Sequence, residues 1–380
     1  MSMSAVEWKE LGKLVKRNKG ISITAGQMSE LNTRNGNVRV FAAGQTIADI
    51  DEDNLPHNCA YKLPSIIVKS RGYIDFEFYD KPFTHKNEMW SYSFTNIDLG
   101  KFIYYYLTTK TDYFRNKAKA NSVKLPQLCV ADTDNYLIPI PSLAKQQEIV
   151  SHLDTFTTLI SNLESELDMR RKQYEHYRNQ LLDISEKDSK YIVPFGDICK
   201  IIRGNGVQKS DFVDVGLGCI HYGQIYTYYG SYSYTTNRFV SQDVFNKAVK
   251  ASKGDIIMTD TSENVEDICK SVAYLGEEDI AVSNHSFIIK HNQNPKYLSF
   301  CTLTNSFGFQ KKKVVFGAKV SSIKQANLAK INIYLPPMEE QNQIVSKLNA
   351  FENLIQSLEQ EIKLRKQQYE YYREKLLTFE

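Results

Sequence analysis

Apolar residues recur at alternating steps of three and four along two stretches of the chain. The first stretch has Ile149, Leu153, Phe156, Ile160, Leu163, Leu167, Arg170, Tyr174, Tyr177 and Leu181 at these positions. The second has Ile344, Leu348, Phe351, Ile355, Leu358, Ile362, Arg365, Tyr369, Tyr372 and Leu376. This spacing predicts one seam on a long helix of the coiled-coil type. Because neither run contains proline or glycine, we expect two helices of roughly 40 residues, each about 60 Å long.

The two stretches are copies of one another. Residue 149 aligns with residue 344, a shift of 195, and about half of the positions from 141 to 182 are identical under it. The shift extends faintly upstream, where it pairs Phe114 with Phe309 and Lys124 with Lys319. The segments "VFAAGQ" and "CIHYGQ", and "PSIIVKS" and "GDIIMTD", match at other shifts. We therefore interpret the whole chain as a tandem duplication.

A narrow apolar seam on a long helix requires a partner helix. Burial of one large apolar side chain is worth about 1.5–3 kcal/mol, so a solvent-exposed seam would be costly. The natural partner is the other copy, and an antiparallel pair satisfies the pseudo-twofold symmetry of a duplication. The predicted helix-pair seam consists of Leu153, Phe156, Ile160, Leu163, Leu167, Leu348, Phe351, Ile355, Leu358 and Ile362.

Each seam contains one arginine. Antiparallel pairing about the centre of the two copies would bring Arg170 near Glu359 and Arg365 near Glu164. Two such ion pairs would fix the register of the helices. The alternative is that both guanidinium groups extend past the seam into solvent.

The regions outside the helical stretches form two lobes of mixed pattern. Short runs rich in β-branched and aromatic residues, such as "NVRVFAAG", "SIIVKS", "DIIMTD" and "HSFIIK", predict strands. The runs "LGKFIYYYLTTKTDYFRNKA" and "PKYLSFCTLTNSFGFQ" predict helices. We expect α/β (α+β) lobes at 1–140 and 191–335, alternating with helical segments at 141–190 and 336–380.

Composition and cysteine usage narrow the class of protein. An apolar content of 42% and a charged content of 24% are ordinary for a globular protein. The six cysteines form no C-x-x-C pair, which argues against a zinc site and suits a reducing compartment. We see neither a signal segment nor a run long enough to cross a bilayer. We therefore expect a cytoplasmic protein without membrane association.

The positive charge is concentrated in the lobes. Their net charges are +3 and +4, whereas each helical segment carries −2. This distribution is expected if the lobes contact phosphate groups and the helices contact protein. The candidate nucleic-acid-binding residues form four clusters: Lys16, Arg17 and Lys19; Arg115, Lys117, Lys119 and Lys124; Arg203, Asn205 and Lys209; and Lys311, Lys312, Lys313 and Lys319. For any single cluster, the alternative is a solvated face without a ligand.

Motifs for catalysis are weak or absent. The phosphate-binding pattern G-x-x-x-x-G-K-[ST] does not occur. The segment "NPKY" has Lys296 where the motif of adenine methyltransferases requires proline, and "DFEFYDK" has nuclease-like carboxylates without a counterpart in the other lobe. The histidines form no H-x-x-x-H or H-E-x-x-H pattern. We therefore expect a binding protein without a catalytic residue or a metal site.

The duplicated architecture resembles the specificity subunit of type I restriction–modification systems. The resemblance rests on two Pro-x-x-x-x-Gln-x-x-Ile helix starts, formed by Pro141, Gln146 and Ile149 and by Pro336, Gln341 and Ile344. The helix ends "RRKQYEHYRNQLL" and "RKQQYEYYREKLL" and the segment "GDIIMT" add to it. The resemblance covers essentially the whole chain. The first lobe departs from it, with "LPSIIVKS" in place of the "GDII" form.

The resemblance implies a division of labour between the segments. Each lobe would be a target recognition domain that reads one half of a bipartite site in double-stranded DNA. The helix pair would set the gap and dock two methyltransferase subunits, which carry S-adenosylmethionine. Restriction subunits would add ATP- and Mg-dependent cleavage, so this chain would hold no cofactor.

Two other classes of protein remain as alternatives. A coiled-coil scaffold whose lobes bind proteins would lack the steep salt dependence of DNA binding. A nuclease or methyltransferase would show turnover as a purified chain, given magnesium or a methyl donor.

Overall fold

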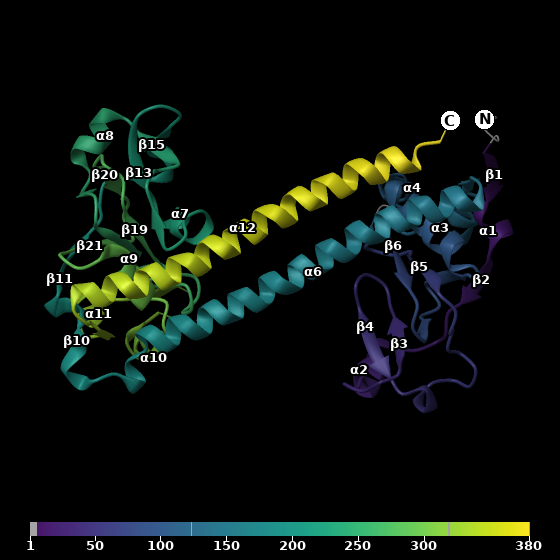
Figure 1. Ribbon diagram of the computed structural model, residues 1–380, viewed down its shortest axis with the longest axis horizontal. Coiled ribbons are helices and arrows are strands. Elements are labelled where there is room, and N and C mark those ends of the chain that lie inside the picture. Colours follow the sequence, from purple (N-terminus) through teal and green to yellow (C-terminus); the bar gives the residue numbers. More distant parts are fainter. Residues whose placement is uncertain (1–5, 123, 318–319, 380) are drawn as a thin grey trace. The chain divides into compact units, whose positions relative to one another are not determined.

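The structure is a computed structural model that describes residues 6–122, 124–317 and 320–379. The chain divides into two compact units, one formed by residues 1–164 and 360–380 and the other by residues 165–359. Two 40-residue helices, α6 (Leu143–Leu182) and α12 (Met338–Leu377), cross these boundaries (Figure 1). Their lengths confirm the prediction from the heptad pattern. Among the described residues, no helix has the length and apolar character needed to span a membrane.

The first lobe contains two sheets and a strand pair. One sheet has the order β2-β8-β5-β6, the other has the order β4-β3-β7 with β3 and β7 parallel, and β1 pairs with β9. Helices α3 and α4 pack against the first sheet (Figure 1). The strands are β1 Glu7–Glu10, β2 Lys16–Lys19, β3 Val38–Phe41, β4 Ile47–Ile50, β5 Ser65–Lys69, β6 Asp75–Tyr79, β7 Phe83–His85, β8 Trp90–Ser93 and β9 Leu137–Ile140. The helices are α1 Leu11–Leu14, α2 Ala25–Leu31, α3 Ile97–Thr109, α4 Thr111–Asn121 and α5 Val130–Asp134.

The second lobe has larger sheets. Their orders are β11-β21-β17-β19-β14 and β12-β15-β13-β20-β16, with strand pairs β18-β22 and β10-β23. The strands are β10 Ile192–Pro194, β11 Cys199–Arg203, β12 Phe212–Val213, β13 Leu217–Ile220, β14 Tyr232–Ser233, β15 Arg238–Val240, β16 Lys250–Ala251, β17 Ile256–Thr259, β18 Thr261–Ser262, β19 Ser271–Tyr274, β20 Ile280–Val282, β21 Ser286–His291, β22 Ser321–Ser322 and β23 Asn332–Tyr334. The helices are α7 Tyr222–Thr227, α8 Gln242–Lys247, α9 Pro295–Cys301, α10 Asn305–Val314 and α11 Gln325–Leu328.

The two lobes share a topology, which confirms the duplication. The strand order β2-β8-β5-β6 of the first lobe recurs as β11-β21-β17-β19 in the second lobe. The sequence match of "SIIVKS" to "DIIMTD" aligns the central strands β5 and β17. The parallel pair β3-β7 recurs as β13-β20, as the match of "VFAAGQ" to "CIHYGQ" predicts. The predicted mixed helix-and-strand lobes are therefore confirmed. The shift between copies changes along the chain because loops of different length separate equivalent strands.

One predicted match between the copies is wrong. Phe114 of α4 is fully buried, whereas Phe309 of α10 is 63% exposed. Phe307 takes the buried position instead, and the next buried positions along these helices are Ala118 and Lys311. The copies are therefore offset by two residues from the predicted shift in this helix, because the preceding loops differ in length.

The Pro-x-x-x-x-Gln helix starts have a structural role. Gln146 donates a hydrogen bond from Nε2 to the carbonyl oxygen of Pro141 at 2.8 Å, and Gln341 does the same to Pro336 at 2.9 Å. Both glutamine side chains are buried. Each thereby satisfies a carbonyl group where the chain turns from a strand into a long helix.

The helix-pair seam is buried or half-buried within each unit. In the unit of the first lobe, Phe156 stacks on Tyr372 with ring centroids 5.5 Å apart. In the unit of the second lobe, Phe351 stacks on Tyr177 at 5.4 Å. These contacts join opposite ends of α6 and α12, so the antiparallel pairing is confirmed inside each unit. The ten predicted seam residues are all shielded from solvent at least in part.

The predicted arginine pairs are wrong by one residue. Arg170 pairs with Glu166 of its own helix at 3.3 Å, and Arg365 pairs likewise with Glu361 at 2.9 Å. The pairs between the helices are formed by the next residue along. Arg171 lies 2.6 Å from Glu359, and Lys366 lies 2.6 Å from Glu164. A residue beside the seam reaches across it more easily than a residue within it, as at the flanking positions of coiled coils.

Candidate DNA interface

Each lobe carries a basic residue followed by glycine at the end of an edge strand. Strand β2 ends at Lys19 and strand β11 ends at Arg203. A Cβ atom on Gly20 would lie 2.2 Å from a backbone carbonyl oxygen of the segment that follows β7. A Cβ atom on Gly204 would lie 2.4 Å from a backbone carbonyl oxygen of the segment that follows β20. Only glycine fits such an approach. We call this place the basic corner of each lobe. The two cations belong to different clusters in the sequence, so their equivalence becomes visible only in the fold.

The basic corner of the second lobe is a connected polar cluster. The buried carboxylate of Asp260, which follows β17, lies 3.2 Å from Nη2 of Arg203 and 3.7 Å from Nδ1 of His285. Thr261 donates its hydroxyl proton to Oδ1 of Asp260 at 2.8 Å. Tyr222 packs edge-on against His285, with ring centroids 5.5 Å apart. The side chain of Arg203 is 64% exposed, so the cluster presents a guanidinium group to solvent.

The basic corner of the first lobe is built from different side chains. Asn18 donates hydrogen bonds from Nδ2 to the hydroxyl groups of Ser91 and Ser93, at 2.9 and 2.7 Å. Tyr61 donates its hydroxyl proton to the carbonyl oxygen of Lys19 at 2.8 Å. Behind it, His85 is fully buried, and burial lowers the pKa of its imidazole to about 4. The imidazole is therefore neutral near pH 7, and the positive charge at this corner comes from lysine.

The basic side chains of β2 differ in their partners. Nε of Arg17 lies 3.3 Å from Oδ2 of Asp134, and the other carboxylate oxygen, Oδ1, accepts a hydrogen bond from the Tyr92 hydroxyl group at 2.5 Å. Lys16 and Lys19 are exposed, and the described part of the chain supplies neither with an ion pair. Both ammonium groups are therefore available to an anion, whereas the charge of Arg17 is partly compensated.

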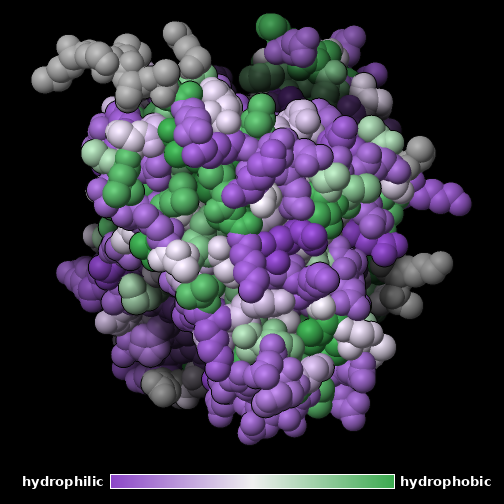
Figure 2. Space-filling model, turned by 90° about the vertical axis from the view of Figure 1, so that its right-hand side faces the viewer, coloured by the Kyte–Doolittle hydropathy of each residue, from purple (hydrophilic) through white to green (hydrophobic). Residues whose placement is uncertain are grey.

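The basic residues on and after α4 lie on the surface of the first lobe. Arg115 pairs with Asp112 at 3.3 Å and donates from Nε to the carbonyl oxygen of Ile74 at 3.2 Å. Lys119 and Lys124 are exposed, and neither forms an ion pair with another described residue. The side of the molecule seen in Figure 2 is mainly hydrophilic, with hydrophobic residues in small patches between. Because they are exposed and unpaired among the described residues, Lys119 and Lys124 remain candidate anion contacts.

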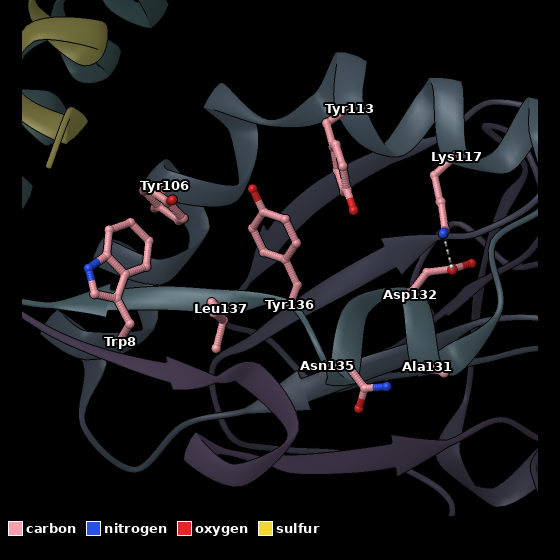
Figure 3. A pocket seen from close by; sticks show the side chains of 9 residues that line it. All are labelled: Trp8, Tyr106, Tyr113, Lys117, Ala131, Asp132, Asn135, Tyr136 and Leu137. Carbon is pink, nitrogen blue, oxygen red and sulfur yellow. Dashed lines mark ion pairs between the residues drawn. The ribbon is translucent and has the colours of Figure 1, made fainter. Parts of the chain in front are cut away.

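Lys117 lies at an aromatic pocket rather than on a uniformly basic surface. The pocket has a volume of about 560 Å³ and is bounded by β1, α3, α4, α5 and β9 (Figure 3). Trp8, Tyr113 and Tyr136 line it with aromatic rings. Nζ of Lys117 lies 4.0 Å from Oδ1 of Asp132, which compensates part of its charge. This geometry makes Lys117 a weaker candidate for a phosphate contact than Lys119.

Lys311 was predicted to contact phosphate, and the structure contradicts that role. Its side chain is buried at 7% exposure, and Nζ donates hydrogen bonds to the carbonyl oxygens of Glu266 and Ile268, both at 2.8 Å. Burial lowers the pKa of its ammonium group. The lysine therefore joins α10 to the segment before β19, and its charge does not reach the surface.

The remaining basic residues of this cluster have separate surroundings. Lys312 pairs with Glu266 at 3.2 Å, and both side chains are largely exposed. Nζ of Lys313 lies 4.1 Å from the ring centroid of Phe309 on the same helix. Lys319 lies outside the described residues. Of the four predicted lysines, Lys312 and Lys313 remain candidates for an anion contact.

The third predicted cluster adjoins a second pocket. Asn205 is exposed, and its carbonyl oxygen accepts a hydrogen bond from the backbone of Val249 at 3.1 Å. Lys209 lines a pocket of about 410 Å³ together with His221 and Arg238. Burial, aided by the charge of Lys209, lowers the pKa of His221 to about 4. This pocket therefore combines two cations with a neutral imidazole that can donate or accept a hydrogen bond.

Four side chains at these places were not predicted from the sequence: Asp260, His285, Tyr222 and Arg238. Asp260 follows β17, His285 precedes β21, Tyr222 lies on α7 and Arg238 lies on β15, so only the fold brings the first three together near the end of β11. The sequence does contain a sign of the basic corners. In both "RNKG" and "IIRG", a glycine follows the basic residue that ends the strand. That signal was not recognised because the two segments match at a shift different from 195.

Comparison with known proteins identifies the family. The family described as "Type I restriction modification DNA specificity domain" matches residues 3–169 and 186–364. The Escherichia coli type I restriction enzyme EcoR124I/EcoR124II specificity subunit is 28% identical over 404 residues, which cover 98% of this chain and 94% of the relative. A putative type I restriction enzyme specificity subunit of Haemophilus influenzae is also 28% identical, over 99% of this chain and 96% of the relative.

A solved structure shares the fold. The type I restriction–modification S subunit from M. genitalium matches with a TM-score of 0.61 at 16% identity, covering 99% of this chain and 97% of that one. At this identity the likeness concerns the fold alone, and it agrees with the duplicated lobes and long helices. From the two family matches, which together cover most of the sequence, the chain belongs to the type I restriction–modification DNA specificity family.

Proposed function

We propose that this chain reads a bipartite sequence in double-stranded DNA for a type I restriction–modification complex. The observation that carries the proposal is the basic corner, which recurs at the same strand end in both lobes with different neighbours. A positively charged residue at the same place in each lobe suits a face that approaches negatively charged DNA. Different side chains at and around this place, lysine in one lobe and arginine in the other, suit the reading of different bases. Each lobe thus reads one half of the site.

The predicted segments supply the functional boundaries of the proposal. Residues 1–140 and 191–335 act as the two target recognition domains, and residues 141–190 and 336–380 act as the helical spacers. The helix pair sets the gap between the half-sites. Support comes from α6 and α12, which each continue without a break through 40 residues.

The long helices also dock two methyltransferase subunits. Their outer faces carry large apolar side chains that are well exposed, among them Met169 at 62% and Leu364 at 56%. These two residues match under the 195-residue shift, so the two helices offer the same feature twice. A single exposed apolar side chain is common, but its recurrence at the same place on both helices suits a repeated protein partner. Two matching faces suit two copies of one partner.

The chemistry lies in partner subunits under this proposal. The methyltransferase subunits supply S-adenosylmethionine, and restriction subunits supply ATP- and Mg-dependent cleavage. The purified chain then binds DNA without turnover, and its affinity falls steeply with salt because binding releases counterions from phosphate. A scaffold whose lobes bind proteins would lack this salt dependence.

Exchange of one lobe tests the proposal. Residues 191–335 are replaced by the second lobe of a relative, and the chain is expressed with its methyltransferase subunit. Sequencing of methylated bases in the genome then reports the motif. We expect a bipartite motif for the original chain and a change in one half only after the exchange. A motif without a gap, or a change in both halves, would contradict the proposal.

A further inference from the structure

The basic corner of the second lobe holds its arginine in a defined orientation. The carboxylate of Asp260 is 5% exposed, and the side chain of Arg203 that it binds is 64% exposed. The backbone of Asp260 is itself fixed, because its N–H donates to the carbonyl oxygen of His285 at 3.1 Å and its carbonyl accepts from Ile323 at 3.0 Å. A rigid buried acid therefore anchors a guanidinium group that reaches solvent.

Among the described residues, most hydrogen-bond donors of this guanidinium group have no partner. A guanidinium group has five N–H donors in a planar fork. Within the described residues, Asp260 is its one ion-pair partner, through Nη2. A planar fork matches O6 and N7 of guanine in the major groove, the commonest specific contact of arginine with a base. An orientation fixed before binding reduces the conformational entropy lost on binding.

The neighbouring backbone is strained in a way that supports a role in recognition. His285 adopts a φ of +62°, in the left-handed region that residues other than glycine seldom occupy. Such conformations concentrate at functional sites, where the surrounding structure holds them. At this position His285 lies 3.7 Å from Asp260 and packs against Tyr222. The arginine is thus flanked by two further side chains able to contact a base.

The first lobe lacks this arrangement. Its basic corner has Lys19 in place of Arg203, and the match of β5 to β17 places Ser70 at the position of Asp260. The hydroxyl group of Ser70 donates to the backbone carbonyl of Glu88. An ammonium group on a flexible stem cannot form the two parallel hydrogen bonds that a guanidinium group forms. The oriented fork is therefore specific to the second lobe.

We infer that Arg203, oriented by Asp260, determines specificity in the second lobe by reading a guanine of its half-site through the major groove. Asp260 acts as a positioning residue, because its carboxylate is buried and it acts through the arginine. The inference rests on the proposed function and adds the identity of one base and the side chain that reads it.

Methylation motifs of single-residue variants test the inference. The full chain carrying Arg203→Ala, Arg203→Lys or Asp260→Asn is expressed with its methyltransferase subunit, and methylated sites are mapped across the genome. We expect the first half-site and the gap to remain as in the original chain. One guanine in the other half becomes tolerant of other bases, with discrimination reduced about 5- to 150-fold for both Arg203 variants. Asp260→Asn gives a smaller loss at the same guanine.

Controls separate the inference from loss of folding and from the proposed function. Lys253→Ala, which removes an exposed pair with Glu277 elsewhere in the lobe, should leave the motif unchanged. Arg203→Lys keeps the charge and the stem, and melting temperatures verify that each variant folds.

Three outcomes would overturn the inference. They are an unchanged motif in both Arg203 variants, relaxation at a base other than guanine, and an equal loss of methylation at every site, which would indicate a phosphate contact. If the original chain itself directs no bipartite methylation, the proposed function fails, and that result is visible before any variant is compared.

Discussion

At the scale of single residues, burial decides what a charged side chain does. Lys311 stands in a run of three lysines, yet it faces the interior of the second lobe and binds two backbone carbonyl groups. Lys312, the next residue, pairs at the surface. Sequence alone identifies the run but not which lysine points inward, since that depends on the rotation of α10 against its neighbours.

Lys311→Met should destabilise the second lobe without weakening DNA binding. The substitution keeps the apolar stem but leaves the carbonyl groups of Glu266 and Ile268 without their donor. The carbonyl group of Ile268 is buried, and an unsatisfied buried group costs about 1–3 kcal/mol, so the free energy of unfolding should fall by at least that amount. Denaturant titration measures it, with Lys312→Ala as a control that should change stability by less than about 0.5 kcal/mol. If the folded Lys311→Met variant bound DNA more weakly than the original chain, Lys311 would again be a candidate phosphate contact.

His85 should make the stability of the first lobe dependent on pH. Burial lowers its pKa to about 4, against the opposing influence of the Lys86 carbonyl group and the charge of Glu88. The unfolded chain binds a proton near pH 6.5 and the folded chain does not, so stability is lost as pH falls from about 6.5 to 4.

His85→Gln removes that titration. The stability of the original chain relative to this variant should fall by about 2–3 kcal/mol between pH 7.5 and 4.5. Urea titrations at the two pH values measure the difference. An NMR titration of the His85 ring near its ordinary pKa would contradict the prediction.

At the scale of elements, the long helices were predictable and their ion pairs were not. The heptad pattern identifies the helices and the seam because solvent exposure of a repeated apolar stripe is costly over 40 residues. A cross-helix ion pair depends on side-chain direction, and a shift of one residue turns that direction by about 100°. Arg170 therefore pairs within α6, and Arg171 reaches Glu359.

Leucines on α12 should differ sharply in their contribution to stability. Leu348 is fully buried in the core of the second lobe, whereas Leu354, less than two turns away, is 39% exposed. Leu348→Ala should lower the free energy of unfolding by about 2–5 kcal/mol. Leu354→Ala should change it by less than about 0.5 kcal/mol. Equal effects in chemical denaturation would show that this part of the seam is not buried.

At the scale of the whole molecule, the duplication was predictable, but the equivalence of its candidate DNA-binding residues was not. Matching of strong motifs identifies the copies and the mixed helix-and-strand lobes. Loops of different length change the difference in residue number between equivalent positions of the two copies. Lys19 and Arg203 therefore occupy the same place in the fold although they are not 195 residues apart. Which side chains surround each basic corner depends on strands far apart in the sequence. That information appears only when the sheet order is known.

The most direct test of the account lengthens both helices at once. Seven residues are inserted after Leu167 in α6 and after Ile362 in α12, positions that match under the 195-residue shift. A seven-residue insertion preserves the heptad seam. Genome-wide mapping of methylated sites should then show the same two half-sites separated by a longer gap. An unchanged gap, or an altered half-site, would contradict the claim that the lobes read the DNA and the helix pair sets their spacing.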